Sequence, residues 1–238
     1  MEHNKKQPLS TQNAIIIAGF LIVIAILITR GGGIAATGGA TKEKTLSEQV
    51  GVDKDKFTQC LKDTDLQALR NTTNTIAENA MKGVPTDQRG TPYSVIVGKN
   101  GSKAEVRGAY PKEDVLKFVA EVTAGKVTTP YTGEIAGYTA GDHIFGNPSA
   151  PIMIIEYSDL ECPYCKRFSS TLRDIVNESN GNIAWVYRHW IVHPGALPKA
   201  GAAECVAKLK GNDAFWKYID LVFGTLKTAD DAPDTSNL

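Results

Sequence analysis

The sequence predicts an α/β domain preceded by one N-terminal transmembrane helix. Residues 14–28 form an apolar run without a charge, which is the pattern of a membrane segment. Further along, short runs rich in β-branched residues end at Gly and Asn turn signals and predict strands. Between them, apolar residues recur three or four positions apart and predict helices.

Composition limits the number of domains and the kinds of partner. The chain has 238 residues, of which 42% are hydrophobic, and its formal net charge is zero. A chain of this length and composition can bury one or two cores. Nothing in this balance indicates a nucleic acid or another polyanion as a partner, so we expect none.

Residues 1–30 are predicted to hold a cytoplasmic N-terminus and a membrane anchor. Lys5 and Lys6 precede the apolar run and Arg30 follows it. Because positive residues stay on the cytoplasmic side, Lys5 and Lys6 should hold the N-terminus in the cytoplasm. Everything after Arg30 should then be extracytoplasmic. The run is shorter than the ~20 residues of a typical span, although the weakly polar residues up to position 36 could lengthen it. A cleaved signal peptide and a buried core helix are the alternatives, and we expect the anchor.

The next residues predict a Gly/Ala-rich tether. It is followed by the first half of the domain, with two helices, a hairpin and a third helix. Residues 31–45 are predicted to be the flexible tether. The spacing in residues 46–81 predicts two short helices. Residues 93–97 and 103–107 predict two strands joined by a turn with an Asn-Gly signature, and Pro111 opens a helix that reaches residue 122.

The other half follows a linker at residues 124–142, which is rich in Gly, Thr and Pro. Residues 152–155 are a continuous apolar run that predicts a buried strand. A helix should then begin at the stretch Cys162-Pro163-Tyr164-Cys165. Residues 182–190 predict another strand, and residues 197–223 predict helix interrupted near Gly211.

The two cysteines of this stretch have the spacing of a redox pair. A thiolate at a helix N-terminus faces unpaired backbone N–H groups and the positive end of the helix dipole, which stabilise the anion. Pro163 suits the first helical position, so we expect Cys162 to be the exposed thiol. Cys165, one turn further in, should be shielded. One accessible nucleophile and one resolving thiol are what disulfide exchange requires.

Two other interpretations of these cysteines stay open. Cys162 and Cys165 with His189 and His193 spell C-x2-C-x23-H-x3-H, whose middle spacing exceeds that of common zinc fingers. The cysteines could also be inert packing residues. We expect the redox pair, with no metal and no cofactor.

The surrounding residues resemble a known family. The runs GNPSAPIMIIEYSDLECPYCKRF and AAECVAKLKGNDAFWKYIDLVF are similar to the DsbA-like branch of the thioredoxin superfamily, which comprises exported thiol–disulfide oxidoreductases. The resemblance implies that Cys162 is the nucleophile and Cys165 the resolving thiol. It also implies that Glu156 is a buried acidic residue beneath the active site, whereas a strand glutamate exposed at an edge is the alternative.

The resemblance also implies a circular permutation. Segments that resemble the C-terminal half of the family lie in residues 46–123, and those that resemble its N-terminal half lie in residues 143–238. The expected fold is therefore a thioredoxin-like domain over residues 46–238, with a helical insertion and its two halves in exchanged order. The same resemblance implies that Thr91 and Pro92 form a cis peptide bond next to the redox cysteines.

Two more sets of residues follow from the resemblance. Cys60 and Cys205 lie in segments that resemble the helical insertion, where some family members carry a second disulfide, and two buried free thiols are the alternative. Thr91 and Pro92, together with Pro163 and Tyr164, are expected to contact the substrate.

The expected function is a membrane-anchored, extracytoplasmic thiol–disulfide oxidoreductase that introduces disulfides into exported proteins. Its substrates would be reduced exported proteins, and the family implies reoxidation by a quinone-linked membrane partner. A disulfide reductase or isomerase is the alternative within the enzyme class, because CPYC also occurs in glutaredoxin-like proteins. A zinc-stabilised binding module and an inactive product of gene rearrangement are the alternatives outside it.

Overall fold

The computed structural model describes residues 44–129, 131–139 and 141–226. The chain divides after Glu43 into two units, and every element below belongs to the second unit. The predicted membrane anchor and most of the predicted tether therefore lie outside the described residues. Within the described part of the chain, no helix combines the length and apolar character needed to cross a membrane.

The described chain begins with three helices, so the prediction of two over residues 46–81 is wrong. They are α2 (Leu46–Gln49), α3 (Lys54–Asp63) and α4 (Leu66–Ala80). The Asp53 side chain accepts hydrogen bonds from the first N–H groups of α3, and Asp65 does the same for α4. Gly51, with a φ of 76°, lies between the first two helices. The capping residues and Gly51 thus end one helix and begin the next at positions that the spacing of apolar residues alone does not reveal.

A five-stranded sheet forms the centre of the unit, in the order β2-β1-β4-β5-β3. Its strands are β1 (Tyr93–Gly98), β2 (Lys103–Arg107), β3 (His143–Gly146), β4 (Ile152–Ser158) and β5 (Ile183–His189). Strands β4 and β5 are parallel, and the other pairs are antiparallel. Because β1 pairs directly with β4, the two sequence halves share one sheet. The short edge strand β3 was not predicted.

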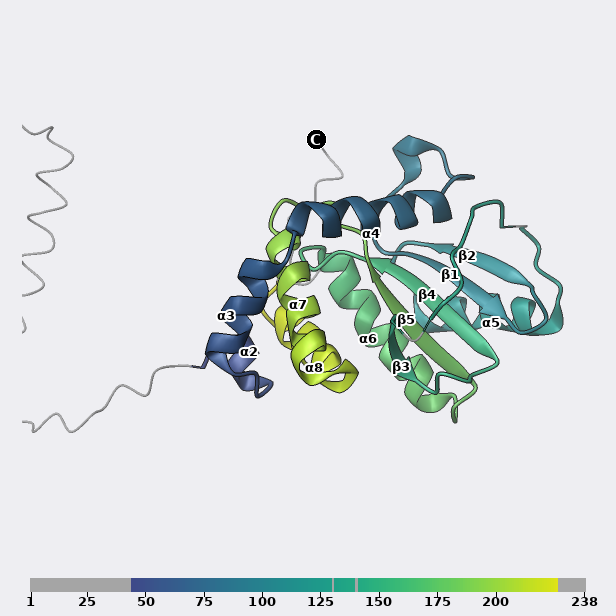
Figure 1. Ribbon diagram of the computed structural model, residues 1–238. Helices are drawn as coiled ribbons and strands as arrows, with labels where there is room; N and C mark the ends of the chain where they lie inside the picture. Colours follow the sequence, from purple (N-terminus) through teal and green to yellow (C-terminus); the bar gives the residue numbers. More distant parts are fainter. Residues whose placement is uncertain (1–43, 130, 140, 227–238) are drawn as a thin grey trace, which may run out of the picture. The chain divides into compact units, whose positions relative to one another are not determined.

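Helices cover both faces of this sheet (Figure 1). On one face, α5 (Lys112–Ala124) and α6 (Pro163–Glu178) pack against alternate strand residues such as Ile96, Ile154 and Trp185. On the other face, α4 packs against the remaining alternate residues, which include Val95, Ile155 and Val186. A short 3-10 helix, η1 (Thr86–Gln88), follows α4. Burial on both faces explains why β4 is apolar almost throughout.

Two helices complete the first face, and a disulfide holds them to the start of the described chain. They are α7 (Ala196–Lys210) and α8 (Asn212–Gly224), separated by Gly211 as predicted. Cys60 of α3 and Cys205 of α7 form a disulfide, the pairing that the family resemblance implied. Figure 1 shows α3 lying beside α7. A Cβ atom at Gly201 would lie 2.3 Å from Leu66 Cδ2, so α4 also packs closely on α7.

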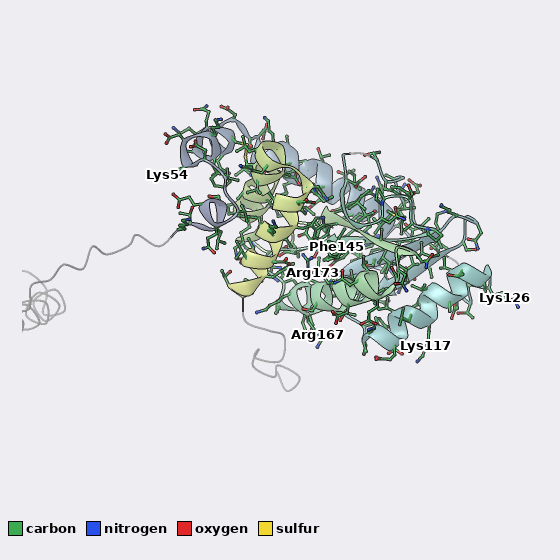
Figure 2. All side chains as sticks on the ribbon, turned by 90° about the horizontal axis from the view of Figure 1, so that it is seen from below. Lys54, Lys117, Lys126, Phe145, Arg167 and Arg173 are labelled. Atoms are coloured by element: carbon green, nitrogen blue, oxygen red, sulfur yellow. A yellow bond between two sulfur atoms is a disulfide. The ribbon has the colours of Figure 1, made fainter. Side chains whose placement is uncertain are left out.

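The edge strand β3 is held by an arginine and several aromatic rings. The Arg173 guanidinium of α6 lies 4.5 Å from the centroid of the Phe145 ring, a contact that can be followed in Figure 2. The same guanidinium lies 5.5 Å from the Trp216 ring and forms an ion pair with Asp220. Cation–π contacts of this kind join α6, α8 and β3.

Candidate active site

The two redox cysteines lie at the N-terminus of α6, as the sequence predicted. Cys162 is the N-cap residue and Pro163 is the first helical residue. Both Cys162 and Cys165 are free thiols. The helix packs its buried residues against the central strands, so the motif lies at the end of β4 where the chain enters α6.

The prediction that Cys162 is exposed is wrong, because the residue is only 3% exposed. Its Sγ lies 3.4 Å from the carbonyl oxygen of Thr91, within hydrogen-bond distance for a thiol. The Thr91–Pro92 peptide bond is cis, as expected from the resemblance. The structure thus brings the Thr91–Pro92 loop against the cysteine from a segment about seventy positions earlier in the chain.

The environment of Cys162 favours its thiolate. A hydrogen bond from the Cys165 thiol is the largest influence that lowers the pKa of Cys162, from its ordinary value of 9.0 to about 6. Burial acts in the opposite direction, while the Thr91 side chain and the backbone N–H groups of Tyr164 and Cys165 lower the pKa further. The helix N-terminus therefore contributes, as predicted, although the neighbouring thiol contributes more.

Cys165 has the opposite properties. It is completely buried, and the backbone N–H of Asp159 donates a hydrogen bond to its Sγ over 3.4 Å. Burial raises the pKa of Cys165 well above its ordinary value, and the hydrogen bond with Cys162 raises it further. At neutral pH the pair thus holds a thiolate at Cys162 and a protonated thiol at Cys165. That asymmetry suits the first as nucleophile and leaving group.

Glu156 lies beneath the cysteines and is fully buried, as the resemblance implied. Burial raises the pKa of its carboxyl to about 8, and the Ser158 hydroxyl and the Trp185 indole only partly offset that rise. Neither carboxyl oxygen has a hydrogen-bond partner with good geometry among the described residues. At neutral pH the group is mainly a neutral acid, which can give a proton to a nearby sulfur.

Asp159 holds the active-site loop to a second loop. Its Oδ2 accepts backbone hydrogen bonds from Val192 at 2.7 Å and His193 at 2.9 Å. Its Oδ1 accepts one from Glu161 at 2.7 Å. Sequence reasoning missed this residue. The one available signal was an acidic side chain placed between a buried strand and the CxxC stretch.

The outer surface of the site is partly apolar. Tyr164 is 49% exposed, and the Arg167 guanidinium lies 5.3 Å from the centroid of its ring. Figure 2 labels Arg167, which lies on α6. Val192, on the loop held by Asp159, is also exposed. The charge of Glu161, the acidic residue next to Cys162, is paired with Lys199 at 2.6 Å.

The two histidines of the alternative zinc pattern face carboxylates. His189 Nε2 lies 3.2 Å from Glu204 Oε1, and His193 Nδ1 lies 3.1 Å from Asp159 Oδ1. Among residues 44–129, 131–139 and 141–226, no group of three or more His, Cys, Asp or Glu side chains is arranged to hold a metal ion.

The low pKa of Cys162 gives a testable pH dependence. In the reduced full-length chain, ultraviolet absorbance of the thiolate should appear with a midpoint near pH 6 and be lost below it. Because this pKa is depressed relative to the unfolded chain, the thiolate stabilises the reduced fold most above pH ~9 and progressively less as the pH falls towards 6. The Cys162→Ser variant is the control, and a midpoint near 9 in the wild-type chain would contradict the described environment.

Comparisons with known proteins find similarity over part of the chain. Residues 138–236, which contain the CxxC helix, match a family model described as Thioredoxin. A crystal structure of DsbA2 from Pseudomonas aeruginosa matches with 34% identity over 37% of this chain and 50% of that chain, at a TM-score of 0.34.

Several similar curated proteins are named as antiporters. Na(+)/H(+) antiporter NhaA 1 of Salinispora arenicola is 38% identical over 37% of this chain and 14% of its own length. NhaA 1 of Mycolicibacterium gilvum is 34% identical over 34% of this chain and 13% of its own length. The chain thus spans about one seventh of the length of these relatives.

The α/β sheet and the CxxC pair at the start of α6 form a thioredoxin-like fold, and residues 138–236 are the part of the chain that is similar to the family model. Such a fold supports a thiol–disulfide oxidoreductase in general.

Proposed function

We propose that this protein is a dithiol–disulfide oxidase that introduces disulfides into exported proteins through Cys162 and Cys165. The observation that carries the proposal is the pairing of a Cys162 thiol of pKa about 6 with a buried Cys165 of raised pKa. Stabilising the Cys162 thiolate stabilises the reduced enzyme, and a disulfide whose reduced form is stabilised is readily donated.

The proposed reaction has two exchange steps. A substrate thiolate attacks Cys162 Sγ in the enzyme disulfide, so a mixed disulfide forms and the Cys162–Cys165 bond breaks. The electron pair goes to Cys165 Sγ, which takes up a proton, and Glu156 is the proposed donor. A second substrate thiolate then attacks the substrate sulfur, and Cys162 leaves as the thiolate. The substrate is oxidised by two electrons and the enzyme is reduced.

The Thr91–Pro92 loop is the proposed binding site for an extended substrate segment. Thr91 contributes the carbonyl that lies 3.4 Å from Cys162 Sγ, so a chain bound there would have its cysteine beside the enzyme sulfur. Pro163 is partly exposed and Tyr164 exposed, and we propose that both contact the substrate. These apolar groups suit unfolded chains of varied sequence.

The location and partners are proposals that rest on the sequence. The apolar run at residues 14–28 and the flanking positive residues support a single-pass anchor with the catalytic unit outside the cytoplasm. The Cys60–Cys205 disulfide suits an oxidising compartment. A quinone-linked membrane protein would reoxidise the reduced pair. The antiporter relatives match over only about 14% of their length, so no transport is proposed.

We also propose that the two halves of the domain are permuted relative to DsbA-like relatives. Two observations support this: the family match covers residues 138–236 alone, and β1 of the preceding half pairs with β4 in the same sheet. A rearranged chain with residues 143–238 placed before residues 46–123 should then keep the native circular dichroism spectrum and donate disulfides. Failure of that chain to fold would contradict the proposal.

The full-length oxidised chain tests the proposed reaction. Mixed with a reduced, unfolded protein whose native disulfides are known, it should generate those disulfides without another oxidant present. The redox potential of the Cys162–Cys165 pair should be well above the ~ −270 mV of thioredoxin. A potential near that value would favour the reductase alternative, and a chain that forms no disulfides in the test protein would contradict the oxidase.

A further inference from the structure

Polar side chains continue from the active site along one face of the sheet. Glu156 and Ser158 are alternate residues of β4, and Tyr187 and His189 are alternate residues of β5. Alternate strand residues share a face, and here that face is the one covered by α6. Glu156 lies opposite Tyr187 and Ser158 lies opposite His189 in the parallel pairing. These four residues and Glu204 of α7 are called the polar track below.

The buried part of the polar track carries polar atoms that have no protein partner. Glu156 is 0% exposed and Ser158 and Tyr187 are each 1% exposed. The two Glu156 carboxyl oxygens, Ser158 Oγ and Tyr187 Oη lack hydrogen-bond partners among the described residues. Because an unpaired polar group is costly to bury, a cluster of them needs an explanation. Polar groups of this kind are commonly bridged by buried water.

Tyr187 links the active site to the outer part of the track. Burial raises the pKa of Tyr187 well above its ordinary value; the charges of Glu156 and Cys165 add to that rise, whereas the Ser158 hydroxyl opposes it. In the parallel pairing Tyr187 lies opposite Glu156, so the two residues are neighbours on the same face of the sheet. The Tyr187 ring also lies 5.1 Å from the His189 ring, measured between centroids.

The outer part of the track is a carboxylate between two histidines. Glu204 Oε1 lies 3.2 Å from His189 Nε2 and 2.9 Å from His143 Nε2. Burial acts to raise the pKa of Glu204, but hydrogen bonds from His143 and His189 hold it well below its usual range. The carboxylate is thus an anion that lies between two imidazole rings.

A surface pocket meets this outer part. Its volume is about 160 Å³, and its lining includes Tyr187, His189 and Glu204. The Glu204 side chain is 35% exposed and the His189 side chain is 3% exposed, so the track runs from solvent into the core. An ion pair between Arg188 and Asp142, at 2.8 Å, forms another part of the pocket wall.

We propose that the polar track carries a proton between this pocket and the Glu156–Cys165 pair during disulfide donation. The proposal rests on the proposed function, in which breaking the Cys162–Cys165 bond leaves an electron pair on Cys165. Cys165 then takes a proton from the Glu156 carboxyl. The Glu156 carboxylate, which has no direct contact with solvent, takes a proton from water through His189, Tyr187 and Ser158. Neither electrons nor further reactants are needed, and the His189–Glu204 pair is a positioning and relay element.

A purely structural role predicts a different result for one conservative change. If Tyr187 only fills the core, Tyr187→Phe removes an unpaired buried hydroxyl and should leave stability equal or higher. The rate of disulfide donation would then not change. If the hydroxyl relays a proton, the rate falls even though the fold is as stable as before.

The experiment is a single-turnover reaction of the oxidised full-length chain with a reduced cysteine peptide, followed from pH 6 to 9. Tyr187→Phe and Glu204→Gln should slow donation at pH 8 about tenfold, a modest share of the effect of general acid catalysis. The redox potential should stay unchanged, because it depends only on the end states. Imidazole added to the Glu204→Gln variant should restore part of the rate. Asp142→Asn, which makes the same charge change in the same pocket, is the control and should react at the wild-type rate.

Each outcome separates this proposal from the proposed function. Rates for Tyr187→Phe and Glu204→Gln equal to wild type would overturn the proton route and leave the oxidase standing. A loss of rate that matches a loss of folded protein in Glu204→Gln, together with a wild-type rate in Tyr187→Phe, would overturn it as well. A wild-type chain that donates no disulfide would overturn the oxidase and the route together.

Discussion

Replacing Cys162 by serine is expected to reduce disulfide donation to the uncatalysed background. In Cys165→Ser, the Cys162 thiolate should attack the disulfide of an oxidised substrate and stay in a covalent mixed disulfide, because no resolving thiol remains. The reason is the asymmetry of the pair. Cys162, with a pKa of about 6, provides the sulfur that the substrate attacks. Cys165, which is fully buried, is the thiol that breaks the mixed disulfide from within.

Non-reducing gels and mass spectrometry of the full-length variants distinguish these species. Mixed with a substrate protein whose disulfide is intact, the Cys162→Ser chain should show no adduct, and the Cys165→Ser chain should show one that dithiothreitol releases. Ser170→Ala, an exposed change on the same helix, is a matched control that should behave like the wild-type chain. A stable adduct on Cys165 in the Cys162→Ser variant would reverse the assigned roles.

Removing the Cys60–Cys205 disulfide is expected to lower the free energy of unfolding by roughly 2–5 kcal/mol. The bridge joins residues separated by 145 positions, so it strongly restricts the unfolded chain. It also ties α3 to α7. The double change Cys60→Ala and Cys205→Ala removes both sulfurs and leaves no reactive thiol.

Urea unfolding in non-reducing buffer measures this effect. The comparison is made in a background with Cys162→Ser and Cys165→Ser, so that changes of the active-site pair do not contribute. A free energy of unfolding within ~0.5 kcal/mol of that background would contradict a stabilising role for the bridge. Disulfide donation by the double variant with an intact CPYC pair should persist below its unfolding transition, because the bridge joins α3 to α7, whereas the reacting sulfurs belong to the start of α6.

Local sequence signals were sufficient for most of the secondary structure. The Asn-Gly turn predicted the β1–β2 hairpin, Pro111 and Pro163 marked two helix starts, and Gly211 marked the break between α7 and α8. Each of these signals acts over a few residues, through a fixed φ, a missing N–H or a backbone conformation that glycine adopts readily. The strand β3 carried no such signal, because a four-residue edge strand forms only when β5 is beside it.

The sequence by itself also predicted which thiol should be the nucleophile, because Cys162 precedes Pro163 at a helix N-terminus and Cys165 does not. Only the tertiary structure decided that Cys162 is covered by Thr91, and that Tyr187, His189 and Glu204 continue from the active site to a surface pocket. Contacts between distant segments depend on sheet order and helix packing, which no short stretch encodes. The pKa values of Cys162 and Glu156 follow from those contacts and from burial, so they became visible only once the chain was folded.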